Sequence, residues 1–179
     1  MAWSAPMTAV ANSTFSAAQF NQFVRDNLNE TAPAKATAAG SYFVGAAVNS
    51  IIERRAVTGA DLTTGTTTST TYGNLSGTSV GPSVTCETGP AALVMVRGSI
   101  ENSGAGSARM AYEVSGAHNQ APADHRGIHI FEGALTNIGA SDVTLMTPLT
   151  PGVNTFTARY RVSSGTGTFS ARRITVVPF

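Results

Sequence analysis

Two histidines, His125 and His129, are the residues best suited to chemistry, because they are spaced four apart with Asp124 beside them. On an α-helix this spacing would place both imidazoles on one face, where they could share a metal ion. The residues around them are typical of a β-strand, in which positions four apart lie about 13 Å from each other. One ion cannot bridge that distance. The sequence therefore favours ordinary surface or interface histidines over a metal site.

Other catalytic patterns are also missing from the sequence. No Gly-x-Ser-x-Gly nucleophile motif occurs, and the acidic residues are scattered singly. A glycosidase pair would require two distant carboxylates, such as Glu113 and Glu132, to meet in space. The Gly-rich stretches 104–106 and 165–167 lack the Lys and the following helix of a phosphate-binding loop. We therefore expect a protein that is not an enzyme and holds no cofactor or metal.

The composition is typical of a β-rich protein whose surface meets other proteins. Apolar residues make up 42% of the 179 residues, enough for a core, and this length suits one domain with an appendage. Only 12% of the residues are charged, about half the usual share for a soluble globular protein. The formal net charge is +1 and the basic residues are spread along the chain, so we expect no nucleic-acid binding.

Cysteine usage and the first residues indicate where the chain folds. Cys86 is the only cysteine, so no disulfide framework is expected. The first seven residues contain neither the basic nor the apolar segment of a secretion signal. The apolar stretch 91–96 is far too short to span a bilayer. We expect folding in a reducing bacterial cytosol and no membrane insertion.

The pattern of residues 1–60 predicts an extended arm followed by one amphipathic helix over residues 16–30. Ser16 and Gln19 have the spacing of a capping box, in which each side chain bonds the backbone N–H of the other residue. Apolar residues then recur at helical spacing, at Phe20, Phe23, Val24 and Leu28. Pro33 ends the pattern, because the residue before a proline is displaced from the α region.

The apolar face of this helix needs a partner, because an isolated helix of about four turns is marginal in water. Burying its two phenylalanines, one valine and one leucine would contribute about 6 to 10 kcal/mol. The partner is the rest of the same chain, a sister subunit or another protein. Trp3 lies on the flanking arm and also requires a partner.

The remainder of the chain predicts β-structure. Two short strands are expected at 40–45 and 50–55, followed by a Thr- and Gly-rich linker over 58–71. From residue 66 onward apolar and polar residues alternate between turn-forming segments. This pattern predicts eight strands, at 66–74, 83–87, 91–100, 109–115, 127–131, 142–146, 154–162 and 168–177. We expect a mainly β fold, an antiparallel, jelly-roll-like β-sandwich over 61–179 with a short N-terminal α-helical anchor.

Two of the predicted strands indicate their surroundings. In 154–162 the apolar residues alternate with threonines and with Arg159 and Arg161, so both arginines are expected in solvent or at an interface. The segment 91–96 is apolar on both faces, which predicts a central strand covered on both sides. Jelly rolls of this size often form trimers that bury strand edges, and the weakly charged surface is consistent with a homotrimer.

A short N-terminal motif resembles a known family. The stretch Phe15–Thr31, with Trp3 before it and Pro33 after it, is similar to the N-terminal signature of virion structural proteins from tailed phages of actinobacteria. Those proteins typically have a Trp, a short spacer, a Thr-Ala-Ala-x-hydrophobic-Asn segment and then Arg-Asp-Asn-Leu. Here Asn21 and Arg25–Leu28 match at the same spacing. The adjoining segments, up to about residue 55, also resemble the next module of that family.

The resemblance implies a structural protein on the virion surface whose N-terminal region attaches it to the particle. In that family the signature precedes both tail-associated fibres and small head-surface proteins. Apolar side chains of the anchor would fill a groove on a neighbouring protein, and polar ones would hydrogen-bond it. The anchor residues predicted in this way are Trp3, Phe20, Asn21, Phe23, Val24, Arg25, Asp26 and Leu28.

Three functions remain open. The first is a capsid decoration protein, a trimer bound to the major capsid protein or another virion protein, because 179 residues leave no room for a long shaft. The second is a minor tail protein of the tail tip or baseplate that binds a host surface glycan. Its candidate loop residues are Tyr112, His118, Asn119, Gln120 and His125. The third, a carbohydrate-binding module outside any virion, is disfavoured by the missing secretion signal and the single tryptophan.

Overall fold

The computed structural model describes residues 3–78, 80–131 and 137–179, and it divides the chain into two compact units. The first unit ends at Arg55 and the second begins at Ala56. The division falls a few residues earlier than the predicted boundary at residue 60. The reason is that β3 (Val57–Asp61) pairs with β11 (Gly167–Pro178) and so belongs to the second unit.

The helix of the N-terminal unit begins with the predicted capping box. The Ser16 Oγ accepts from the Gln19 backbone N–H at 3.2 Å, and the Gln19 Oε1 accepts from the Ser16 backbone N–H at 2.9 Å. A continuous helical run comes next, made of α1 (Ala17–Phe20), the π-helical turn η1 (Asn21–Arg25) and α2 (Asp26–Asn29). This confirms the predicted helix.

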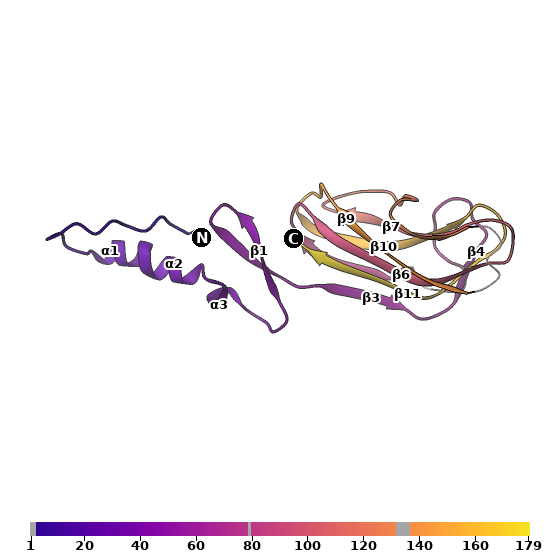
Figure 1. The fold of residues 1–179 in the computed structure, drawn as a ribbon, viewed down its shortest axis with the longest axis horizontal. Helices are drawn as coiled ribbons and strands as arrows, with labels where there is room; N and C mark the ends of the chain where they lie inside the picture. The colour runs from indigo at the N-terminus through magenta and orange to yellow at the C-terminus, as the bar shows by residue number, and fades with distance from the viewer. Residues whose placement is uncertain (1–2, 79, 132–136) are drawn as a thin grey trace. The chain divides into compact units, whose positions relative to one another are not determined.

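A second, one-turn helix and a hairpin complete this unit (Figure 1). The helix α3 (Ala32–Lys35) carries Pro33 in its first turn, where a proline's missing N–H costs nothing. The proline therefore starts a helix instead of ending one, and that part of the prediction is wrong. The predicted strand pair is confirmed as an antiparallel hairpin of β1 (Tyr42–Ala47) and β2 (Ser50–Arg54).

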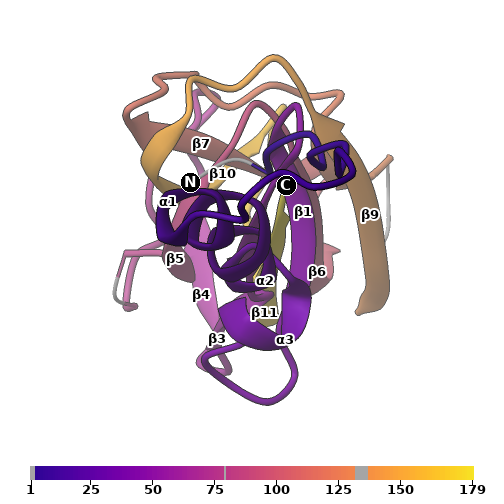
Figure 2. The same ribbon diagram turned by 90° about the vertical axis from the view of Figure 1, so that its left-hand side faces the viewer.

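The second unit consists of two antiparallel sheets (Figures 1 and 2). One has the order β5-β10-β7-β8 and the other the order β3-β11-β6-β9, with β4 also pairing β11. The remaining strand bounds are β4 (Gly65–Thr67), β5 (Ser83–Thr88), β6 (Ala92–Asn102), β7 (Ala108–Gly116), β8 (Gly127–Ile130), β9 (Ile138–Met146) and β10 (Gly152–Val162).

The strand pairing is that of a jelly roll. Within the two sheets β3 pairs β11, β5 pairs β10, β6 pairs β9 and β7 pairs β8, all antiparallel. The first strand of the sandwich, β3, thus pairs with the last, β11, and the pairs β5–β10, β6–β9 and β7–β8 are nested inside it along the chain. This nesting is the arrangement of a double Greek key. This confirms the predicted antiparallel β-sandwich with a short N-terminal helix.

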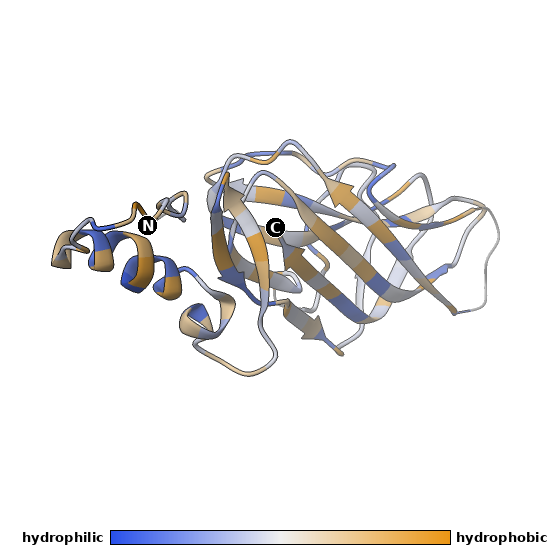
Figure 3. Cartoon of the chain, turned by 60° about the vertical axis from the view of Figure 1, so that its left-hand side comes forward, coloured by the Kyte–Doolittle hydropathy of each residue, from blue (hydrophilic) through white to orange (hydrophobic). Residues whose placement is uncertain are grey.

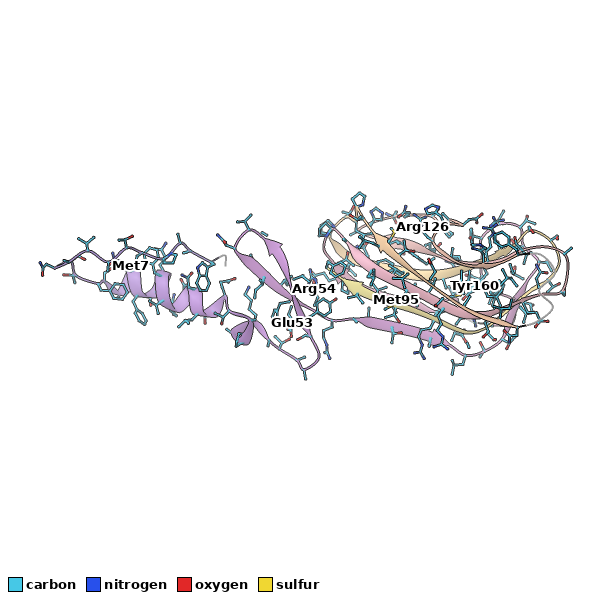
Figure 4. All side chains as sticks on the ribbon, viewed as in Figure 1. Met7, Glu53, Arg54, Met95, Arg126 and Tyr160 are labelled. Carbon is cyan, nitrogen blue, oxygen red and sulfur yellow. The ribbon has the colours of Figure 1, made fainter. Side chains whose placement is uncertain are left out.

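The core lies between the two sheets, and the predicted alternation on β10 fills it. The apolar side chains of this strand, Phe156, Ala158, Tyr160 and Val162, are all buried. Figure 4 shows Tyr160 among the strands of the sandwich, and Figure 3 shows the alternation of apolar and hydrophilic residues along the strands.

The two arginines of β10 are partly exposed on the outer surface of their sheet, where both form ion pairs. The Arg159 Nη2 lies 2.5 Å from a Glu113 carboxylate oxygen, and the Arg161 Nη2 lies 2.5 Å from Asp124. Asp124 also accepts from the Tyr72 hydroxyl at 2.9 Å and pairs with Arg109. Acidic residues on neighbouring segments therefore neutralise the arginines on this sheet surface.

The predicted linker at 58–71 is wrong, because half of its residues are strand. It contains β3 and β4, which lie one after the other along the same side of β11. The loop after β4 then runs along β10, where Tyr160 exchanges two backbone hydrogen bonds with Gly73. A Thr- and Gly-rich composition suits this edge, since threonine is a good strand residue.

A buried arginine organises one end of the core. Arg172 is fully buried, and its Nη2 lies 2.7 Å from the Asp61 carboxylate. Its Nη1 donates to the Gly81 carbonyl at 3.1 Å and to the Tyr160 hydroxyl at 3.2 Å. The register of β11 shifts here around Ala171, which has φ 48°. Because of this bulge, neither Ser170 nor Ala171 is buried, and the next residue, Arg172, faces the core.

Candidate functional site

Polar contacts hold the N-terminal unit together. The buried Asn27 of α2 clamps the extended arm, since its Oδ1 accepts from the Ser4 N–H at 2.8 Å and its Nδ2 donates to the Ser4 carbonyl at 3.1 Å. The Trp3 N–H donates to the Asn49 carbonyl at 2.7 Å. The arm is therefore fixed against both the helix and the hairpin turn of the same unit.

A second polar contact joins the helices to the hairpin. The Lys35 Nζ pairs with the Glu30 carboxylate at 2.8 Å and donates to the Ile51 carbonyl at 2.8 Å. This ammonium group lowers the pKa of the Glu30 carboxyl. Lys35 is the only lysine of the chain, and its compact charge and flexible stem suit a contact with one carboxylate and one carbonyl.

The Glu53 carboxylate closes the loop before the hairpin. It accepts from the hydroxyls of Ser41 and Thr37 and from the backbone N–H groups of Thr37 and Ala38. The hydrogen bonds from Ser41 and Thr37 lower the pKa of Glu53 from 4.5 to about 2. Figure 4 labels Glu53 on this hairpin.

The N-terminal unit should lose this contribution to stability as the pH falls from 4.5 towards about 2. A carboxyl with a depressed pKa stabilises the folded state above its unfolded-state pKa, and protonation removes the effect. A pH titration of the Thr37 and Ala38 backbone amides by NMR should show the loop opening in this window. Glu53→Gln should abolish that transition, and Glu101→Gln on the sandwich should leave it intact. An identical titration of the Glu53→Gln variant and the wild type would contradict the role of this carboxylate.

The N-terminal unit has no apolar core of its own. Among residues 3–55, the buried side chains are Asn27 and Glu30, and no apolar side chain is buried. Six of its large apolar residues are instead exposed, namely Trp3, Val10, Phe15, Phe20, Leu28 and Val48. A unit of this size that leaves six large apolar side chains in water has the features of a docking element.

The structure distributes the predicted anchor residues over two faces. Phe20 and Leu28 are 48% and 59% exposed, whereas Phe23 and Val24 are half-buried. The π-helical turn explains the difference, because the Asp26 N–H bonds the Asn21 carbonyl five residues back and rotates the next helical turn. The predicted single apolar stripe is therefore wrong. Figure 3 shows apolar and hydrophilic residues alternating along this helix.

The polar anchor residues also differ in their roles. Arg25 is exposed, and its guanidinium pairs with the adjacent Asp26 carboxylate at 2.7 Å. Asn21 supplies the carbonyl that accepts the π-helical bond. The residue that the sequence did not single out is Asn27, although it belongs to the Arg-Asp-Asn-Leu motif. Its burial could be recognised only once the arm was seen to fold back along the helix.

The sandwich carries a second unpartnered surface, which we call the β9 apolar face. It consists of Val143 and Leu145 on β9, Leu93 and Met95 on β6 and Val177 on β11, which are direct cross-strand neighbours. Val143 and Leu145 are each 56% exposed, and the other three are half-buried. The strand β6 is central, as predicted, but its outer face is not covered. Figure 2 shows β9 at the margin of its sheet, and Figure 4 labels Met95.

The residues first considered for catalysis are separated by the fold. His125 lies in the loop before β8. His129 lies exposed on β8, with its ring centroid 4.6 Å from that of Phe131. Glu113 pairs with Arg159, and Glu132 lies outside the described residues. In the described part of the chain, no group of three or more His, Cys, Asp or Glu side chains is placed to hold a metal ion.

The loop residues considered for a receptor site come together only in part. His118, Gln120 and His125 line one pocket beside β9. Tyr112 is buried in the core and Asn119 is exposed outside the pocket lining. Arg126 lines the same pocket, and the sequence did not point to it.

Comparisons with known proteins do not assign the chain to a family. No protein-family model matches the chain, and no curated protein matches its sequence. Among the described residues, no helix has the length and apolar character needed to cross a membrane.

Proposed function

We propose that this chain is a non-enzymatic structural protein of a tailed-phage virion that decorates the capsid surface as a homotrimer. The observation that carries the proposal is the N-terminal unit, which holds its shape by polar contacts and exposes its large apolar side chains. Such a unit gains a core by docking on a neighbouring protein. The resemblance of this same segment to phage virion anchors supports the particle as its partner.

The jelly-roll body supports self-association through the β9 apolar face. Its two rows, formed by Leu145, Leu93 and Val177 and by Val143, Met95 and Thr175, contain no charged side chain. An uncharged apolar face leaves no charge unpaired when it is buried, so it suits a second copy of the chain. Among the described strands, none pairs with the edge of β9 away from β6, and association also protects such an edge.

Val143→Glu should therefore dissociate the trimer, because it would bury an unpaired charge at the contact. The control is Val153→Glu, the same change at a 60% exposed valine on β10 of the other sheet. Light scattering after size exclusion should give three times the chain mass for the wild type and the control. It should give the chain mass for Val143→Glu. A monomeric wild type, or equal masses for both variants, would contradict self-association through this face.

Attachment is tested by adding the purified protein to particles that lack it and measuring bound copies after sedimentation. Saturable binding to heads would support decoration. Binding to isolated tails alone would favour the tail-tip alternative, and no binding to either would contradict a virion role.

A further inference from the structure

The sandwich contains a pocket on the side where its two sheets end in the edge strands β8 and β9. Its volume is about 450 Å³, which suits a small ligand. The loop before β8 and the end of β9 supply its walls. The polar side chains that line it are His118, Gln120, His125, Arg126 and Thr144.

Arg126 is the feature of this pocket that points to a ligand. The residue is only 7% exposed, and one guanidinium nitrogen donates to the Ala121 carbonyl. Its Nε is buried without a hydrogen-bond partner among the described residues, and no described carboxylate forms an ion pair with it. A buried guanidinium without a carboxylate partner is costly, and an anion bound in the pocket that Arg126 lines would offset that cost. Figure 4 labels Arg126 at the margin of the sandwich.

Tyr112, whose hydroxyl interacts electrostatically with Arg126, does not neutralise it. Burial raises the pKa of Tyr112 to about 12, so its hydroxyl is uncharged at neutral pH. The Asp142 carboxylate, which also acts on Tyr112, accepts a hydrogen bond from the Thr144 hydroxyl at 3.0 Å. A planar guanidinium with unused donors matches the geometry of a carboxylate or a phosphate.

The fold holds His118 in a defined orientation at the pocket. Its backbone N–H donates to the Asn154 Oδ1 at 2.7 Å, and Asn154 is fully buried. The Thr150 N–H donates to the His118 Nδ1 at 3.3 Å, which places the proton of the neutral ring on Nε2. The ring thus presents a donor for a ligand hydroxyl or carbonyl.

We propose that this pocket binds an acidic saccharide, with its carboxylate or phosphate on Arg126. His118, His125 and Gln120 supply donors and acceptors for the sugar hydroxyls, and Met146 and Pro148 supply an apolar wall for the ring carbons. The proposal concerns the sandwich alone and does not depend on attachment to a particle. It assigns the molecule an adhesive function beside the structural one.

The chain has three histidines, and this allows a direct test by NMR of their imidazole signals. The protein is titrated with glucuronate, glucose 6-phosphate, glucose and inorganic phosphate. We expect saturable shifts at His118 and His125 with either acidic sugar, and an unchanged His129, which does not line the pocket. Glucose and inorganic phosphate should each bind more weakly. Equal shifts of all three histidines, no saturation, or glucose binding as strong as glucuronate would overturn the proposal.

Variants identify the groups that bind. Arg126→Met should weaken glucuronate binding at least about tenfold, since a charge-assisted hydrogen bond is lost. Because Arg126 is buried, the exposed His125→Ala provides an independent variant and should weaken binding without affecting folding. His129→Ala is the matched control and should bind like the wild type. Inorganic phosphate binding as tightly as glucose 6-phosphate would overturn the saccharide part, and unchanged affinity of His125→Ala would overturn the assignment of the pocket.

Discussion

Arg172→Met should lower the free energy of unfolding of the sandwich by about 3 to 5 kcal/mol, because it removes one partner of a buried ion pair. The guanidinium is fully buried, and Asp61 is only 12% exposed at its side chain. Without Arg172, the Asp61 carboxylate, the Gly81 carbonyl and the Tyr160 hydroxyl would each lose one donor. Each lost donor in this buried cluster adds to the cost.

The neighbouring arginine provides the control for this prediction. Arg173 is exposed, so Arg173→Met should change stability by less than about 0.5 kcal/mol. Urea unfolding followed by far-ultraviolet circular dichroism measures both variants in the full chain. Similar unfolding midpoints for the two variants would show that the buried pair does not hold this end of the core.

The double change Phe20→Ser and Leu28→Ser should release the protein from virions. Both side chains are about half exposed in the free chain, so docking would bury roughly half of each. Their loss should cost about 1.5 to 3 kcal/mol of attachment free energy, a decrease in affinity of roughly 10- to 150-fold. Copies bound per particle, measured after sedimentation of decorated particles, report the effect.

The matched control for the anchor is Leu62→Ser, the same chemical change at a 74% exposed leucine of the sandwich. It should leave occupancy unchanged. The anchor variant should also keep its Asn27 contacts to Ser4, since neither changed residue is buried. Wild-type occupancy of the double variant would refute the anchor. A loss of the Ser4 amide signal would instead assign the release to unfolding of the arm.

The elements with local sequence signals were predictable. The capping box of Ser16 and Gln19 is a short-range pattern that needs no tertiary contact, and it is present as expected. The alternation on β10 and β11 results from burial of one face of each sheet, so the sandwich was also foreseen. The jelly-roll order follows once all strands are antiparallel and nested, although sequence alone left it as the leading topology.

Features that depend on distant contacts were missed. The strand β3 has little apolar alternation and contains Gly59, where an added Cβ would lie 2.5 Å from the Ser83 carbonyl oxygen. Close approach of two backbones therefore explains this glycine, and a linker was the wrong interpretation. The bulge at Ala171 likewise decides which of two adjacent arginines enters the core.

In the candidate sites, too, the locally encoded features were predicted and those that depend on the folded structure were missed. The anchor helix was located from its spacing, but the π-helical turn that separates Phe20 from Phe23 has no sequence signature. Three of the pocket residues were named as loop candidates because polar loop residues often bind ligands. Arg126 was not, because an arginine is usually exposed and only the folded loop buries it.

Locating the chain on intact virions is the most direct test of the virion proposal. Cryo-electron microscopy with a tag fused after Phe179 would show its position on the particle. We predict three-fold density at regular lattice positions on the head, with the N-terminal unit against the capsid. Density confined to the tail tip, or none on the particle, would contradict capsid decoration.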